Sequence, residues 1–211
     1  MKNRLATALV ASVLTLFPLV AAAQGGVEGL SSYEQSRLAA GHLVARAERA
    51  ADDPGRLGGH SWQVVDLPPD VVWSAVRDAS RYRDILPGVQ AVRVASAHDD
   101  AMRVEVVQGR GSISVRYHML VRFNDARRLA MFRLDTTKRN DVQAAWGFVR
   151  VRPYAGGKSL VSFGALTDLE QPTLTSTFVR ASIDRALLAV PASLKAYVEG
   201  AGRDRYVNAE G

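Results

Sequence analysis

The stretch LPPDVVWSAVRDASRYRDILPGV, residues 67–89, has a helical pattern that is short and interrupted. Two prolines begin it, and they are tolerated there because the first N–H groups of a helix have no intrahelical partner. Ser80 is a cap for a second short helix, which Pro87 and Gly88 close. The apolar residues at helical spacing in the first helix are Val72, Trp73 and Val76. The stretch therefore predicts two short helices rather than one long helix.

The segments before this stretch predict another short helix and two strands. Residues 31–40 begin with a Ser cap and place Glu34 in the first turn, which is typical of a helix start. Residues 41–50 and 60–67 have strand-like alternation, and the loop sequence DDPGRLGG separates them.

The segments after this stretch change to a period of two and then return to a helical period. Short turn sequences separate six strand candidates, so we expect an antiparallel meander. These candidates are residues 89–95, 101–108, 112–123, 129–135, 142–152 and 159–169. Residues 173–199 form an amphipathic helix that Pro191 is expected to kink. The chain is thus predicted to be one α+β domain with an N-terminal extension.

This order of elements resembles the helix-grip fold of the START/polyketide-cyclase-like superfamily (SRPBCC), which includes the birch-pollen allergen and coenzyme-Q-binding proteins. The resemblance covers residues 58–200, with support from Trp146 and the final helix. Residues 30–48 also look like the lead-in of exported bacterial members. The residues that carry the resemblance are Pro68, Pro69, Val72, Trp73, Val76, Asp78, Tyr82, Leu86 and Pro87.

The resemblance implies a curved antiparallel sheet wrapped around a long C-terminal helix, with the two short helices closing one end. The gap between sheet and helix becomes a cavity, which family members use for hydrophobic ligands. Apolar residues at alternate strand positions and on one helix face are the candidate ligand-binding residues. They are Val104, Val106, Tyr117, Met119, Phe132, Leu134, Trp146, Phe148, Phe163, Phe178, Ile183 and Leu187.

The polar residues that alternate with this apolar set are expected to face solvent. A slip of one residue in the face assignment would turn them inward, where they could orient a carboxylate or a quinone oxygen. These candidate polar cavity groups are Arg116, His118, Arg133 and Asp135. His118 and Asp135 would then be the acid–base pair of a cyclase-like enzyme.

The first 23 residues read as a signal peptide. Lys2 and Arg4 precede an apolar run, and three alanines end it as in a cleavage site. We therefore predict four segments: residues 1–23 as a signal peptide, 24–57 as an extension with a short helix and a strand, 58–200 as the helix-grip domain, and 201–211 as a tail. Such a protein would be exported, to the periplasm in a bacterium.

Composition and charge narrow the expected partners. The chain has 27 Lys and Arg against 21 Asp and Glu; without Lys2 and Arg4 the balance is 25 to 21, a net charge of +4. These charges are scattered, so no nucleic-acid surface is expected, while weak attraction to anionic lipid head groups leaves transient membrane contact open. Cysteine is absent, and the four histidines lack metal-ligand spacing. We expect no metal and no cofactor.

These observations favour an exported protein that binds or carries an apolar small molecule or lipid, such as a quinone, a sterol or a polycyclic compound. Two alternatives stay open. One is a cyclase- or aromatase-like enzyme with an acid–base pair in its cavity. The other is a protein-interaction module with a closed cavity. The sequence gives no indication of the oligomeric state.

Overall fold

The computed structural model describes residues 29–48, 56–110, 113–168 and 177–207. Eight antiparallel strands form one sheet in the order β1-β2-β8-β7-β6-β5-β4-β3. The strands are β1 (Val44–Ala47), β2 (Arg56–Val65), β3 (Val89–Ala97), β4 (Ala101–Arg110), β5 (Ile113–Asn124), β6 (Leu129–Leu134), β7 (Ala144–Tyr154) and β8 (Lys158–Asp168). The meander from β3 to β8 is the one that the alternating segments predict.

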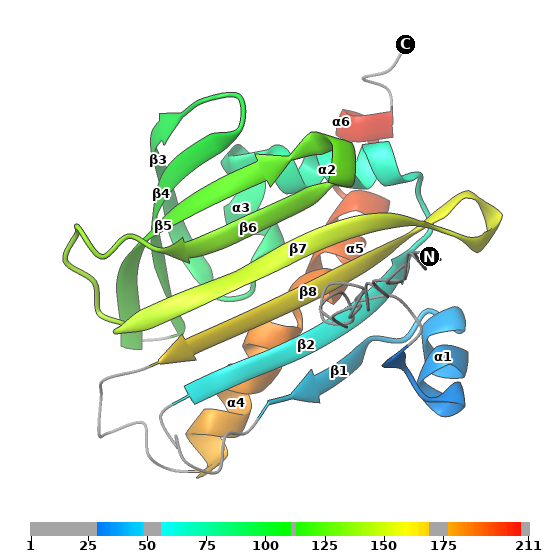
Figure 1. The fold of residues 1–211 in the computed structure, drawn as a ribbon, viewed down its shortest axis with the longest axis horizontal. Helices are drawn as coiled ribbons and strands as arrows, with labels where there is room; N and C mark the ends of the chain where they lie inside the picture. The colour runs from blue at the N-terminus through cyan, green and yellow to red at the C-terminus, as the bar shows by residue number, and fades with distance from the viewer. Residues whose placement is uncertain (1–28, 49–55, 111–112, 169–176, 208–211) are drawn as a thin grey trace, which may run out of the picture.

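Helices lie on both faces of this sheet and at its ends. Figure 1 shows the sheet in front of α4 and α5, with α1 at the β1 edge. The helices are α1 (Ser32–Ala39), α2 (Pro69–Arg77), α3 (Tyr82–Ile85), α4 (Thr177–Leu188), α5 (Val190–Glu199) and α6 (Arg203–Val207), with short 3-10 turns η2 (Ala79–Arg81), η3 (Asp125–Arg127) and η4 (Ala155–Gly157). We call the face toward α4 and α5 the inner face of the sheet and the opposite one the outer face. This is the α+β helix-grip architecture.

The N-terminal segment is joined to the sheet. The side chains of Ser31 and Glu34 form a capping box, and Glu34 also pairs with Arg46 on β1. α1 packs its buried Leu38 against the outer face near the β1 edge, in a cluster with Val44 and Leu160. Because β1 pairs with β2, the strand of the expected extension is part of the same sheet. The expected border between the extension and the helix-grip domain, at residues 57 and 58, falls inside β2. Residues 1–28, which include the expected signal peptide, lie outside the described residues.

The interrupted helix pair, α2 to α3, breaks at Asp78. The backbone of Asp78 is non-helical, with φ −82° and ψ 81°, and its carboxylate accepts a hydrogen bond from the Ser80 N–H at 3.1 Å. α3 ends at Leu86, whose extended backbone fits the restriction that a following proline imposes. The same Asp78 carboxylate accepts hydrogen bonds from Arg205 at 2.9 Å and Tyr206 at 3.0 Å. Residues 203–207 of the expected tail therefore form a helix that is tied to the helix pair.

The C-terminal helical region is broken rather than kinked. α4 ends at Leu188 and α5 begins at Val190, so Pro191 lies in the first turn of α5, where its missing N–H needs no partner. α5 buries Leu194 and Val198 against the core beneath the sheet. α4 is held to β2 by its buried Asp184, which accepts a hydrogen bond from the N–H of Gly58 at 2.8 Å. Residues 173–176 of the expected helix lie outside the described residues.

The main core lies between the inner face of the sheet and the helices α2, α3 and α5. α2 buries Val71, Val72, Trp73, Ala75 and Val76 in it. In the described part of the chain, no helix is long and apolar enough to cross a membrane.

Candidate functional site

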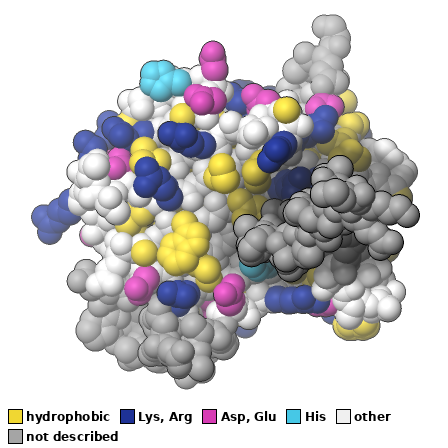
Figure 2. All heavy atoms as spheres, viewed as in Figure 1, with side chains coloured by type: hydrophobic (Ala, Val, Ile, Leu, Met, Phe, Trp, Pro, Cys, Tyr) yellow, Lys and Arg dark blue, Asp and Glu magenta, His cyan; other side chains and the backbone are white. Residues whose placement is uncertain are grey.

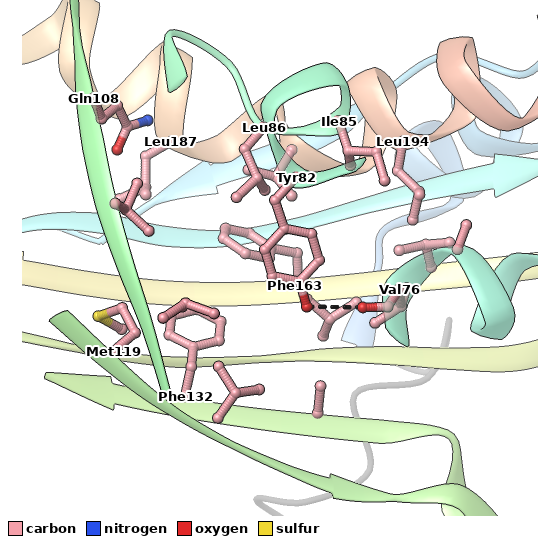
Figure 3. Close-up of a pocket in the computed structure, with 18 of the residues that line it drawn as sticks. Val76, Tyr82, Ile85, Leu86, Gln108, Met119, Phe132, Phe163, Leu187 and Leu194 are labelled. Carbon is pink, nitrogen blue, oxygen red and sulfur yellow. Dashed lines mark hydrogen bonds between the residues drawn. The ribbon is translucent and has the colours of Figure 1, made fainter. Parts of the chain in front are cut away.

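A cavity of about 150 Å³ interrupts this core between the inner face, the helix pair and the helices α4 and α5. Figure 3 shows Gln108 and Leu187 toward one end of it and Val76 and Leu194 toward the other. The strand residues that line it are Val104, Val106, Gln108, Tyr117, Met119, Val121, Ala130, Phe132, Val149, Val161 and Phe163. The helix residues that line it are Ala75, Val76, Tyr82, Ile85, Leu86, Leu187, Val190 and Leu194.

Seven of the twelve candidate ligand-binding residues line this cavity. They lie at alternate positions because successive side chains of a strand point to opposite faces. The rings of Phe132 and Phe163 stack with their centroids 6.0 Å apart. The seven are Val104, Val106, Tyr117, Met119, Phe132, Phe163 and Leu187.

Of three other candidates, two lie elsewhere on the inner side of the sheet, and the side chain of the third lies outside the described residues. Leu134 is buried in the main core but does not line the cavity. Ile183 is half-buried on α4, one turn before Leu187, and is also absent from the cavity wall. The side chain of Phe178 lies outside the described residues.

Trp146 and Phe148 point away from the cavity, so the face expected for β7 was wrong. Val149 pairs with Phe163, whereas Phe148 pairs with Gly164, and pairing partners share a face. The reason lies at Gly147, where an added Cβ would lie 2.5 Å from the ring of Phe132. The small residue on β7 leaves the space that an aromatic ring from β6 fills.

On the outer face the large side chains of β7 join a band of aromatic and basic groups. The ring of His60 lies 5.9 Å from that of Phe148, and Arg56 lies 5.8 Å from the ring centre of Trp146. Trp146 is 42% exposed. Figure 2 shows this side of the molecule, where hydrophobic side chains lie among many Lys and Arg side chains.

The four candidate polar groups also lie on the outer side. Arg116 and Arg133 are exposed, and His118 is half-buried with its ring nitrogen 3.2 Å from the side chain of Asn140. Asp135, only 1% exposed, directs its carboxylate to Thr137 at 2.6 Å and to Arg103 at 2.9 Å. The Thr137 hydrogen bond, together with the charge of Arg103, lowers the pKa of Asp135. Arg116 and Arg133 therefore lie in solvent as expected, whereas Asp135 lies on the same side of the sheet but is buried, and neither His118 nor Asp135 lines the cavity as an inward-facing acid–base pair would.

Three polar side chains do line the cavity, and two of them were not among the candidates. Tyr82 donates to the carbonyl of Val76 at 2.8 Å, the bond drawn in Figure 3. Tyr117 donates to Oε1 of Gln108 at 2.6 Å, and Nε2 of Gln108 donates to the carbonyl of Pro87 at 2.7 Å. Burial raises the pKa of both tyrosines, so both are neutral at physiological pH. Gln108 alternates with Val104 and Val106, a signal by which sequence reasoning could have found it.

None of the described residues that line the cavity is charged or a histidine. Among the described residues there is also no cluster of three or more His, Asp or Glu that could hold a metal ion. The wall can therefore shield an apolar molecule from water and offer it a few neutral hydrogen-bonding groups.

Residues 61–199, well over half of the 211-residue chain, match the family model described as polyketide cyclase/dehydrase and lipid transport. The chain belongs to this family. The matched range contains every residue that lines the cavity. Comparison with curated protein sequences finds no match.

Several solved structures have the same fold. One is the Zhui aromatase/cyclase of a Streptomyces species, 17% identical, covering 76% of this chain and 99% of its own, with a TM-score of 0.56. Another is a STAR-related lipid transfer protein of Xanthomonas axonopodis, 12% identical, covering 74% and 93%, with a TM-score of 0.60. A START superfamily protein of Mycobacterium smegmatis is 13% identical over 67% and 98%, with a TM-score of 0.54. At these identities the similarity establishes the fold.

Proposed function

We propose that this protein binds and carries a hydrophobic small molecule in the cavity on the inner face of its sheet. The observation that carries the proposal is an almost wholly apolar wall around a space in the core, to which the helix pair contributes one side. Pockets that are mostly apolar, with a few placed polar groups, are typical of small-molecule sites. One protein that shares the fold is named as a lipid transfer protein and another as an aromatase/cyclase; the lipid-transfer name agrees with this proposal.

The volume of the cavity limits what it holds in this conformation. About 150 Å³ corresponds to one benzene-sized ring, since apolar cavities of that size bind benzene. A lipid, quinone, sterol or polycyclic compound would require the helix pair to move outward. The pair supplies Val76, Tyr82, Ile85 and Leu86 to the wall, so its displacement would enlarge the cavity directly.

The cyclase-like alternative has less support from the site. It requires an acid–base pair in the cavity, and the two groups expected for that role, His118 and Asp135, lie on the outer side. The neutral wall favours retention of a ligand over proton transfer to it.

We also propose that the protein acts after export. The basis is the N-terminal sequence, in which a basic start, an apolar run and three alanines have the form of a signal peptide. A carrier in the periplasm would move an apolar ligand through water, with brief contact to a membrane surface at each end.

Two matched methionine variants test the binding proposal. Met119 lines the cavity on β5, whereas Met131 on β6 lies on the outer face and is 51% exposed. In Met119→Trp the larger side chain fills the cavity, at a typical overpacking cost of about 1–3 kcal/mol. Met131→Trp makes the same chemical change where there is space.

Native mass spectrometry of gently purified protein, followed by organic extraction, provides the measurement. We expect an apolar adduct on the wild-type protein and on Met131→Trp, and its loss from Met119→Trp. An adduct that Met119→Trp retains would place the ligand elsewhere. A wild-type protein that carries no adduct and takes up none of the apolar probes named below would contradict the binding proposal.

A further inference from the structure

The hydrogen bonds inside the cavity have fixed directions, and these directions restrict the ligand. The inference that follows rests on the proposed function, because it concerns the chemistry of the same cavity. Its starting point is Gln108, which lies on β4 next to the exit of the helix pair.

The amide of Gln108 can be oriented in only one way. Its Nε2 lies 2.7 Å from the carbonyl oxygen of Pro87, which is an acceptor only, so the nitrogen must face Pro87. The amide oxygen then faces the hydroxyl of Tyr117 at 2.6 Å, so that hydroxyl must donate. The proton of Tyr117 is therefore used within the protein.

The hydroxyl proton of Tyr82 is also used, because its partner is the backbone carbonyl of Val76. Each tyrosine oxygen keeps acceptor capacity, as does the amide oxygen of Gln108. The donor capacity that remains among these three side chains is the second N–H of Gln108. The cavity thus offers mainly acceptors to a ligand.

The cavity also lacks compensation for a charge. Among the described residues that line it there is no Lys, Arg or His, and the two tyrosines are already committed as donors. An ionised carboxylate would lose its hydration without gaining a counter-ion, which is strongly unfavourable. A ketone would find only the single N–H of Gln108. A hydroxyl group satisfies the arrangement because it donates to a tyrosine or amide oxygen.

We propose that the cavity selects neutral ligands that carry a hydroxyl group, of the phenol or alcohol type, and that this hydroxyl donates to the Tyr117–Gln108 pair. The described lining residues give a carboxylate no counter-ion, so we expect fatty acids and other carboxylates to bind more weakly than neutral ligands of the same shape. The described arginines of the outer face do not line the cavity, so none of them can pair with a carboxylate inside the cavity.

Three probes of matched shape test the proposal by isothermal titration calorimetry at pH 7: toluene, p-cresol and 4-methylbenzoate. Each carries a single ring, which suits the volume of the cavity. We expect p-cresol to bind about fivefold more tightly than toluene, the usual net value of one hydrogen bond. We expect 4-methylbenzoate to bind at least about tenfold more weakly than toluene, because a buried unpaired charge is costly.

A double variant, Tyr117→Phe with Gln108→Leu, tests the assignment to the pair. Removing both groups together avoids leaving one of them unpaired. We expect toluene affinity to persist, which also shows that the cavity is intact, and the preference for p-cresol to fall to less than twofold. The outer-face variant Met131→Leu serves as the control that keeps the preference.

The outcomes separate this inference from the proposed function. If none of the three probes binds the wild-type protein, the inferred selectivity is wrong, and the binding proposal fails as well when the gently purified protein carries no apolar adduct. If toluene binds but p-cresol gains nothing, or 4-methylbenzoate matches p-cresol, the cavity is a ligand site and the inferred selectivity is wrong. If the double variant keeps the preference for p-cresol, the hydroxyl is bound elsewhere than at the Tyr117–Gln108 pair.

Discussion

The two faces of the sheet contain side chains from the same strands, yet they are stabilised in different ways. On β4 and β5 the inner residues, such as Val104 and Met119, are buried against helices and the cavity. Their outer neighbours form ion pairs, as Glu105 does with Arg93 and Arg116. The comparison teaches that apolar contact shapes the inner face, while electrostatic pairing in contact with water shapes the outer face.

This difference also separates the functions available to each face. The described residues that line the cavity on the inner face are uncharged, which suits an apolar molecule. The outer face has the charges, but they are paired with one another or exposed to solvent. Mutations that compare equivalent positions on the two faces therefore test the whole interpretation.

The largest expected difference concerns one aromatic residue on each face. Phe163 is 4% exposed and stacks on Phe132, so Phe163→Ala is expected to lower the free energy of unfolding by about 3–5 kcal/mol. Trp146→Ala is expected to cost about 1 kcal/mol or less, since it loses mainly an exposed contact with Arg56. Urea unfolding monitored by circular dichroism measures both. Equal losses would show that the faces do not differ in packing.

A smaller difference is expected between two glycines. A Cβ at Gly147 would collide with the backbone oxygen of Gly164 and with the ring of Phe132. A Cβ at Gly164 would meet only the ring ends of Phe148 and His60, which can move. We expect Gly147→Ala to cost about 3 kcal/mol and Gly164→Ala about 1 kcal/mol, measured by the same unfolding curves. A greater loss of stability in Gly164→Ala than in Gly147→Ala would contradict the explanation that residue 147 is small because the ring of Phe132 occupies the space beside it.

The smallest expected effect is confined to acid. The pKa of Asp135 is lowered in the folded protein, so its ionised form stabilises the fold above the unfolded value of about 4. That contribution is lost as the pH falls through the lowered pKa. In Asp135→Asn the urea midpoint should therefore fall less steeply below pH 4 than in the wild type. Thr137→Val, which removes the main hydrogen bond, should change the slope in the same direction but less, and an unchanged slope in both variants would contradict the assignment.

In strands whose polar and apolar residues alternate clearly, the sequence could predict which residues face the core. In β5 the basic residues Arg116, His118 and Arg122 alternate with Tyr117 and Met119, so one face must be apolar. β7 begins AAWGFV, where small and aromatic residues alternate and neither set is polar. Which set faces inward depends on the ring that a neighbouring strand contributes, and that information lies outside β7.

Other features depend on contacts between distant segments. The helix pair could be predicted from its prolines and apolar spacing, because those signals act within a few residues. The expected cap was wrong, since Asp78 and not Ser80 caps the turn between the two helices. The bond between Tyr117 and Gln108 joins the neighbouring strands β5 and β4 and depends on their register. The burial of Asp135 depends on Arg103, which is distant in sequence. Residues 203–207 gave no helical signal strong enough to identify α6.

The attachment of α6 to Asp78 has a kinetic consequence. Arg205 and Tyr206 bind the residue at which the helix pair breaks, and Tyr206 also packs edge-on against Tyr197 of α5. Any outward movement of the pair must first release these bonds, although neither residue contacts the cavity. If the cavity binds the ligand as proposed, the residence time of that ligand would therefore depend in part on α6, whose residues do not line the cavity.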